Sequence, residues 1–380
     1  MKLVTYSYEG GSGWKVRPSA DLDSASTLVM AFGATEVIDK PEALDDLRAT
    51  FPRSLVVGCS TAGEIHGTQI HDGSVSVAVA SFDKTRLGYA QASVESAAGS
   101  RAAGEALARS LVGPELRAVL VLSDGLNVNG TELVGGLNAV LPDGVVVTGG
   151  LAGDGDRFKR TWVIAEGGAR SNVVTAVGFY GDDVRVGHGS KGGWDIFGPE
   201  RLVTRSEGNV LFELDGRPAL ELYKSYLGDR AAGLPATGLL FPLSLRSNDD
   251  KDQKRLVRTI LAVDEATQSL TFAGDIPTGS RAQLMRANFD RLVEGAADAA
   301  IMTGAADDAQ GPVLSVAISC VGRRLVLGER TEEEIEATLD ALPPGAQQVG
   351  FYSYGELSPF ASGRCDLHNQ TMTLTTISER

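Results

Sequence analysis

The sequence repeats one pattern of segments three times, and this repeat limits the folds open to the chain more than any other feature. Each copy has a short apolar strand, a helix with one apolar face, a strand ending in a glycine-framed loop, and a further strand. The copies span residues 28–82, 119–180 and 313–377. They predict an α/β fold: a two-part protein of repeated strand–helix–strand–loop–strand modules on mixed sheets, with helices packed outside.

The loops of the three copies share a spacing of glycine, a few small or polar residues, a second glycine and an acid. They are Gly58–Glu64, Gly149–Asp154 and Gly350–Glu356. The glycine that closes the first strand precedes the loop glycine by 25, 24 and 28 residues in the three copies. The chain holds 46 glycines in 380 residues, about 12% against a usual level of about 7%. Sharp strand exits account for this excess, and α/β folds place ligands at such exits.

Residues 203–300 separate the second and third copies and follow a different pattern. Segments 206–214 and 218–227 are predicted as helices, and segments 256–263 and 269–272 as strands. Residues 249–252 are predicted as a solvated acidic turn. In the third copy, Thr331 and Glu334 have the spacing of a capping box at the start of a helix. We place a domain boundary near residue 217, which gives domains of residues 1–217 and 218–380.

Charge and composition exclude several classes of protein. The 35 Lys+Arg and 49 Asp+Glu give a net charge of −14, so nucleic acid and anionic membranes would be repelled. The longest apolar stretches, such as residues 74–82, are much shorter than the roughly 18 residues of a membrane helix. Three scattered cysteines are too few for a disulfide framework or a zinc knuckle. We therefore expect a cytoplasmic protein that binds neither nucleic acid nor membranes.

Several short runs resemble the FIST family, whose name abbreviates F-box and intracellular signal transduction proteins. The runs are Gly58–Glu64, Gly149–Asp154, Gly193–Trp194, Leu214–Ala219, Cys320–Arg323, Gly350–Glu356 and His368–Thr371. The Gly-Phe-Tyr-Ser-Tyr-Gly-Glu run together with His-Asn-x-Thr is the most specific signal. The resemblance spans nearly the whole chain and implies a FIST N-terminal sensory domain over residues 1–217 and a FIST C-terminal sensory domain over residues 218–380.

The resemblance implies a non-catalytic intracellular sensor of a small ligand such as an amino acid. Bacterial relatives are often linked to histidine kinases or cyclic-di-GMP enzymes. Since no kinase, receiver or cyclase segment is recognisable in this sequence, the resemblance implies signalling through a partner such as a histidine kinase or a diguanylate cyclase. A ligand held between the two parts would favour one relative orientation of them.

The predicted ligand-binding residues come mainly from the loops. Glycines let a ligand approach the backbone. Tyr352, Tyr354 and Glu356 would share one face of an extended strand and would suit a polar ligand, although a partly buried aromatic pair is the plainer alternative. The full predicted set is Cys59, Ser60, Thr61, Glu64, Gly150, Leu151, Asp154, Trp194, Tyr352, Ser353, Tyr354, Glu356, His368 and Asn369.

A haem-based nitric oxide sensor is one alternative, because one branch of the family is implicated in nitric oxide sensing through haem. Haem b would need an axial ligand, most commonly a histidine. Of the four histidines, His188 is the candidate, since Gly187 and Gly189 would leave room for the macrocycle and Trp194 could pack on its face. No Cys-x-x-Cys-His motif is present, which excludes covalent haem.

Two further alternatives come from other classes of protein. Cys59 or Ser60 could act as the nucleophile of a hydrolase or transferase, but the neighbouring sequence supplies no base, so we predict that the protein is not an enzyme. A scaffold that binds only a protein partner is the other alternative. A structure without an enclosed polar cavity between the two parts would favour a scaffold.

Overall fold

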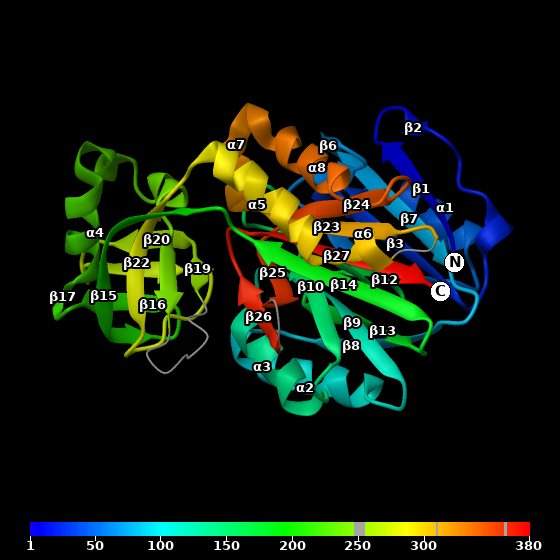
Figure 1. The fold of residues 1–380 in the computed structure, drawn as a ribbon, viewed down its shortest axis with the longest axis horizontal. Helices are drawn as coiled ribbons and strands as arrows, with labels where there is room; N and C mark the ends of the chain where they lie inside the picture. Colours follow the sequence, from blue (N-terminus) through cyan, green and yellow to red (C-terminus); the bar gives the residue numbers. More distant parts are fainter. Residues whose placement is uncertain (247–254, 309–310, 361–362) are drawn as a thin grey trace.

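The computed structural model describes residues 1–246, 255–308, 311–360 and 363–380. The predicted turn at residues 249–252 lies outside them. Figure 1 shows a large body that holds both chain termini and a smaller body to one side of it. The described strands form four sheets, three in the large body and one in the small body. The α/β fold class is confirmed.

Three units of one element order build the large body, as the repeat predicts. The first unit contains β1 (Lys2–Glu9), β2 (Gly13–Trp14), β3 (Thr27–Gly33), α1 (Glu42–Thr50), β4 (Leu55–Ser60), the hairpin β5 (Glu64–His66) and β6 (Gln69–His71), and β7 (Ser74–Ser81). The second contains β8 (Arg86–Ser93), α2 (Ser100–Leu111), β9 (Leu116–Ser123), α3 (Gly130–Val140), β10 (Val146–Leu151), the hairpin β11 (Val163–Ala165) and β12 (Gly168–Arg170), and β13 (Val173–Tyr180). The third contains β14 (Val184–Lys191), α5 (Phe289–Met302), α6 (Ala305–Asp308), β23 (Leu314–Cys320), α7 (Val321–Leu327), α8 (Thr331–Asp340), β24 (Gln347–Ser353), the hairpin β25 (Gly355–Pro359) and β26 (Cys365–His368), and β27 (Met372–Glu379).

Each unit forms most of one sheet and adds its hairpin to the sheet of another unit. The central strands of each unit are parallel: β3 with β4, β9 with β10, and β23 with β24. Strand β11 of the second unit extends the first sheet beside β4, and β25 of the third unit extends the second sheet beside β10. Strand β5 of the first unit extends the third sheet beside β24. The exchange therefore closes a ring of three units.

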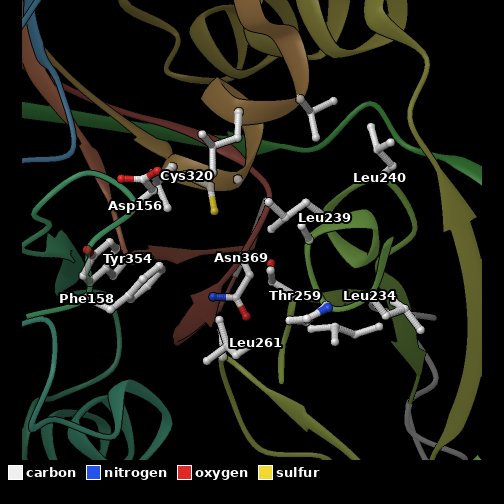
Figure 2. A pocket seen from close by; sticks show the side chains of 18 of the residues that line it. Asp156, Phe158, Leu234, Leu239, Leu240, Thr259, Leu261, Cys320, Tyr354 and Asn369 are labelled. Atoms are coloured by element: carbon white, nitrogen blue, oxygen red, sulfur yellow. The ribbon is translucent and has the colours of Figure 1, made fainter. Parts of the chain in front are cut away.

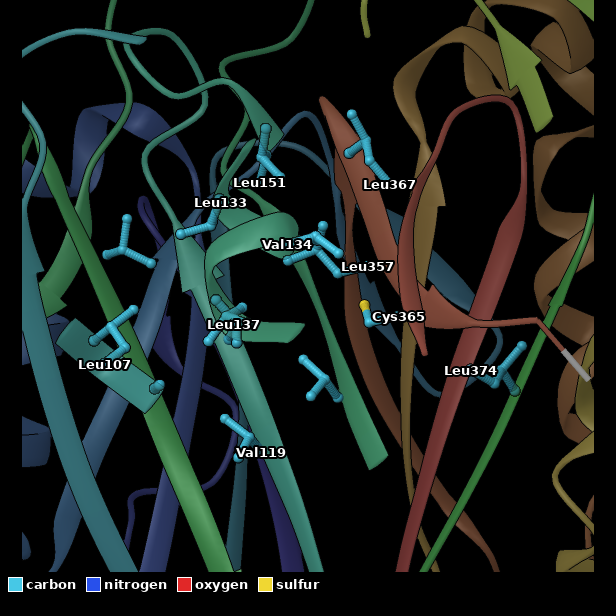
Figure 3. Packing of buried hydrophobic residues seen from close by; sticks show 14 of the residues in the cluster. Leu107, Val119, Leu133, Val134, Leu137, Leu151, Leu357, Cys365, Leu367 and Leu374 are labelled. Atoms are coloured by element: carbon cyan, nitrogen blue, oxygen red, sulfur yellow. The ribbon is translucent and has the colours of Figure 1, made fainter. Parts of the chain in front are cut away.

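The three sheets face one another around a shared apolar core, which includes Phe32 of β3, Leu122 of β9 and Phe351 of β24. The rings of Phe32 and Phe351 lie 4.9 Å apart between centroids. Helices cover the outer faces of the sheets, and Figure 3 shows Leu107 of α2 and Leu133 of α3 in the cluster outside the second sheet. The central strands β3, β9 and β23 are thus buried on both sides, which explains why they are mostly apolar.

The small body is inserted in the third unit, between β14 and α5. It contains β15 (Asp195–Glu207), β16 (Val210–Leu214), β17 (Arg217–Pro218), α4 (Ala219–Leu227), β18 (Leu243–Arg246), β19 (Leu256–Arg258), β20 (Ile260–Asp264), β21 (Ser269–Phe272) and β22 (Arg281–Arg286). Its pairings are antiparallel, and Leu220 and Tyr223 of α4 belong to its own apolar core. Residue 217, where we predicted a boundary, lies in β17.

The predicted helix at residues 206–214 is wrong. This segment ends β15 and forms β16, which pair as an antiparallel hairpin. Gly208 has a φ of +54°, so it turns the chain where a helix would have to continue. The predicted helix at residues 218–227 is confirmed as α4, which starts at Ala219.

Helix α8 begins at Thr331 as predicted, but the predicted capping box is wrong. The Thr331 hydroxyl donates to the carbonyl of Gly328. The Glu334 carboxylate is fully buried and accepts from the guanidinium of Arg323 at 2.7 Å, so it balances a buried charge instead of capping the helix.

Candidate functional site

The three glycine-framed loops meet at one end of the large body, where the carboxyl ends of the central strands converge. A ring of backbone hydrogen bonds joins them: Gly153 N–H to Ser60 O at 3.0 Å, Tyr354 N–H to Leu151 O at 3.1 Å, and Ala62 N–H to Tyr352 O at 2.8 Å. One loop from each unit donates and accepts once in this ring. Loops predicted to form one site are therefore adjacent in the fold.

Most predicted binding side chains in these loops are buried in the protein. The residues exposed by 3% or less are Cys59, Ser60, Thr61, Glu64, Asp154, Tyr352, Ser353 and Glu356. The backbone N–H and hydroxyl of Ser74 donate to Glu64, and those of Thr371 donate to Glu356 in the equivalent arrangement. Burial raises the pKa of Glu64 to about 7 and that of Glu356 to about 8. These carboxyl groups hold the loops together from within.

Tyr352 and Tyr354 point in different directions, because the extended strand is interrupted between β24 and β25. The Tyr352 hydroxyl donates to Glu334 at 2.7 Å inside the protein. The Tyr354 hydroxyl donates to Asp154, whose carboxylate also accepts backbone N–H groups of its own loop. The ring of Phe158 stacks on Tyr354, with centroids 4.4 Å apart and planes 14° apart.

A cavity of about 650 Å³ lies between the large and small bodies (Figure 2). The large body lines it with Asp156, Phe158, Cys320, Val321, Gly322, Leu325, Val326, Tyr354 and Asn369. The small body lines it with Gly233, Leu234, Pro235, Ala236, Leu239, Leu240, Thr259, Ile260, Leu261 and Ala273. Its size suits a small organic ligand, and its lining is mostly apolar. Of the predicted binding residues, Tyr354 and Asn369 line it.

Two buried polar side chains of this cavity are unsatisfied. Asn369 is fully buried, and neither atom of its amide has a hydrogen-bond partner within the described residues. The hydroxyl of Thr259, a residue exposed by 4%, also lacks a hydrogen-bond partner within the described residues. Leaving such a group unpaired costs about 1–3 kcal/mol. In Figure 2, Asn369 lies in the middle of the lining, with Phe158 and Tyr354 on one side and Thr259 on the other.

A second cavity of about 580 Å³ adjoins the first and shares Asp156, Val321 and Leu325 with it. Its one basic side chain among the described lining residues is Arg324. That guanidinium donates to Asp72 at 2.7 and 2.8 Å and to the carbonyl of Ala62 at 2.6 Å. Its hydrogen bonds are thus already directed to the protein.

The other predicted binding residues lie outside these cavities. Gly150 and Leu151 are buried in β10, and the Trp194 indole donates to the Gln370 carbonyl at 2.8 Å. His368 is buried beside the Ser358 carbonyl at 2.9 Å, and burial lowers its pKa to about 4. These residues contribute to packing beside the cavities without lining either of them.

Sequence reasoning missed most of the cavity lining. Phe158, Leu239, Thr259 and Leu261 are examples, because they lie outside the repeated loops in segments without a recognisable motif. One signal was present for Val321 and Gly322, since the family resemblance includes the run Cys320–Arg323.

The surroundings of Cys59 and Ser60 do not suit a nucleophile. Cys59 is fully buried, and burial raises the pKa of its thiol well above the usual value, which keeps it protonated. The Ser60 hydroxyl accepts from the backbone N–H of Trp162 at 3.0 Å. Neither residue lines the two cavities.

Haem was predicted to fit beside His188, but the surroundings of this residue do not leave room for it. His188 lies in β14, and the space beside its glycine neighbours is filled by α5. A Cβ on Gly189 would lie 1.9 Å from the Ala299 carbonyl oxygen, and one on Gly187 would lie 2.2 Å from that of Thr303. The glycines therefore admit a helix, not a macrocycle.

The described residues contain neither a candidate metal site nor a candidate membrane-spanning helix. No cluster of three or more His, Cys, Asp or Glu side chains there is placed to hold a metal ion. No helix in the same ranges combines the length and apolar character needed to span a bilayer.

The fold and the site together define a class: a mixed α/β protein of three linked units and an inserted body, with an apolar cavity between the bodies. The chain belongs to the FIST family. The FIST N domain matches residues 27–217, and the FIST C domain matches residues 219–359. FIST domains are sensory and signalling domains and are typically non-catalytic.

No curated protein matches the sequence significantly. Among solved structures, the chain is similar to a cyanuric acid hydrolase from A. caulinodans at a TM-score of 0.36 and 9% identity, covering 100% of this chain and 99% of that one. A likeness this distant implies nothing about activity.

Proposed function

We propose that this protein is a non-catalytic small-ligand sensor whose ligand binds in the cavity between the two bodies. The observation that carries the proposal is the cavity itself, lined from both bodies and containing two buried polar groups without partners. A ligand that contacts both bodies binds one relative orientation better and shifts the population towards it. A partner such as a histidine kinase or a diguanylate cyclase would read that orientation.

The alternatives receive less support. The filled space beside Gly187 and Gly189 disfavours the haem-based variant at His188. The buried state of Cys59 disfavours a hydrolase or transferase. A scaffold without a ligand would leave the cavity between the two bodies without a role.

A pair of tryptophan variants tests the proposal. Ala236 and Ala232 are both exposed and four residues apart, but only Ala236 lines the cavity. A deproteinised small-molecule extract of cells is added to each variant, and the melting temperature is measured. We expect the extract to stabilise the wild type and Ala232→Trp and to leave Ala236→Trp unchanged, because the indole occupies the ligand space. Equal responses of both variants, or none in the wild type, would contradict a ligand in this cavity.

A further inference from the structure

The cavity between the bodies also carries information about the class of molecule that it binds. Asp156 is the one charged side chain among the lining residues that the structure describes, and it is exposed at the edge. An anionic ligand would meet no cation there, in a chain of net charge −14. A cationic ligand would meet one carboxylate that water and salt screen. The lining therefore favours an uncharged ligand.

The unpartnered groups of the lining define the polar part of that ligand. A primary amide presents N–H donors and a carbonyl acceptor in one plane, and both atoms of the Asn369 amide lack partners. A carboxamide, lactam or cyclic imide carries the complementary donor and acceptor on adjacent atoms. An alcohol or a ketone would satisfy one side of Asn369 and leave the other unpaired. The Thr259 hydroxyl can then pair with a remaining lone pair or N–H of the same head group.

The rest of the lining defines the apolar part. Leu239, Leu261 and Leu325 contribute aliphatic surface, and Leu261 and Leu325 are exposed by 43% and 49%. Phe158 is exposed by 48% although it stacks on Tyr354, so it offers aromatic surface to a planar group. Exposed apolar side chains gathered at one cavity indicate that an apolar molecule covers them.

We infer that the ligand is an uncharged molecule with an apolar body and a carboxamide-like head group, and that the head group pairs with Asn369 and Thr259. This inference rests on the proposed sensor function and names its ligand class. Asn369 follows β26 in the large body, and Thr259 lies between β19 and β20 in the small body. One head group bonded to both side chains would link the two bodies, which is the coupling that a sensor needs.

The amide of Asn369 is closed off from solvent in this arrangement of the bodies. A head group reaches it only if the lining moves apart slightly. Binding of the head group and a change in the relation of the two bodies are therefore one event, whereas binding of the apolar part alone requires no such change.

Four probes that share one apolar body test the head group. They are 4-butylbenzamide, 4-butylbenzoate, 4-butylbenzylamine and 4-butylacetophenone, which present a neutral donor and acceptor, an anion, a cation, and an acceptor alone. Binding to the full chain is followed by ligand-observed NMR titration. We expect 4-butylbenzamide to bind about tenfold more tightly than the other three, since one neutral hydrogen bond is worth roughly that factor.

Two variants and one control test whether the head group binds to Asn369 and Thr259. Asn369→Leu keeps the size of the side chain and removes an unpaired polar group, so the fold should tolerate it. It should abolish the preference for the amide while retaining weak binding of all four probes. Thr259→Val should weaken 4-butylbenzamide several-fold. Thr175→Val is the matched control, because Thr175 is equally buried and its hydroxyl is also unpartnered, but it does not line the cavity.

The results separate this inference from the sensor function. If 4-butylbenzamide fails to bind, or binds no better than the carboxylate, the amine or the ketone, the ligand class is wrong. An amide preference that survives Asn369→Leu also overturns it. In each case the tryptophan pair at residues 232 and 236 still decides whether the cavity binds a small molecule.

Discussion

Arg323 and Glu334 show how single residues brace the site. Both side chains are fully buried, and the guanidinium also donates to the carbonyls of Gly192 and Leu292. These two carbonyls lie close to the points where the chain enters and leaves the small body. The buried ion pair therefore holds both connecting segments on the large body. It would do so in any orientation of the small body.

Glu356 predicts a pH dependence of stability. Burial raises its pKa from 4.5 to about 8 against hydrogen bonds from Ser353 and Thr371 that favour the charged form. The folded protein keeps this proton up to about pH 8, whereas the unfolded chain releases it near pH 4.5. The folded state thus binds more protons between these values, so the free energy of unfolding falls as the pH rises through them.

Glu356→Gln should flatten that fall, because the amide cannot ionise. Each raised carboxyl contributes a slope of up to about 1.4 kcal/mol per pH unit, and Glu64 continues to contribute in the variant. Urea denaturation at pH 5, 6, 7 and 8 measures the effect. The exposed Glu336→Gln is the control and should leave the wild-type slope unchanged. A slope in Glu356→Gln equal to that of the wild type would show that this carboxyl ionises normally.

At the scale of the elements, the parallel strand pairs depend on one glycine in each unit. Gly350 in β24 lies opposite Ala317 in β23, and a Cβ there would lie 1.8 Å from the Ala317 carbonyl oxygen. The equivalent distances for Gly58 and Gly149 are 1.8 and 1.9 Å. The close packing of the parallel strands therefore requires the repeated glycine, whether or not the loop that follows binds a ligand.

Gly350→Ala should lower the free energy of unfolding by about 1–3 kcal/mol or more, because the methyl group forces β23 and β24 apart. Thermal melting followed by circular dichroism measures the loss. Gly11→Ala is the control, since a Cβ at Gly11 meets nothing within 4 Å and should leave the melting temperature nearly unchanged. Similar melting temperatures for both variants would mean that the strands can separate at little cost.

The sequence predicts elements well where the signal is local. The strand before each loop and the helix of each copy follow from apolar runs and helical spacing, and in the second copy this helix is α3 at Gly130–Val140. The hairpin exchange has no local signal, because Glu64 pairs with Phe351 across most of the chain. The predicted helix at 206–214 failed because a single turn at Gly208 outweighs helical spacing over nine residues.

The candidate site was also predictable only in part, because segments far apart in the sequence form it and leave no local signal. Tyr354 and Asn369 lie in runs that the family resemblance identifies, and both line the cavity. Thr259 has no motif around it, and it becomes part of the site only because the inserted body folds back on the third unit. Cys59 and Glu356 were predicted to bind the ligand but are fully buried and line neither cavity. The alternation of side chains along a strand does not reveal which of its faces are covered.

At the scale of the whole molecule, the exchange of hairpins makes the three units depend on one another. Each sheet of the large body needs a hairpin from a second unit, and the inward faces share one core. No unit can therefore unfold without exposing an edge strand and part of the core of another. The small body has its own core, built around α4. Two chain crossings and a small apolar cluster that includes Val257, Met285, Leu292 and Val326 join it to the large body.

This arrangement predicts that the large body unfolds as one cooperative unit and that the small body can unfold separately. Leu47→Ala in α1, Leu133→Ala in α3 and Ile335→Ala in α8 each remove a fully buried side chain from a different unit. Each should cost about 2–5 kcal/mol. Native-state hydrogen exchange should then show an equal loss of protection in the central strands of all three sheets, whichever unit carries the substitution.

Leu220→Ala in α4, an equally buried leucine of the small body, is the matched comparison and should reduce protection in β16 and β21 but leave β3, β9 and β23 unchanged. Loss of protection confined to the substituted unit would show that the exchanged hairpins join the units without coupling their stability.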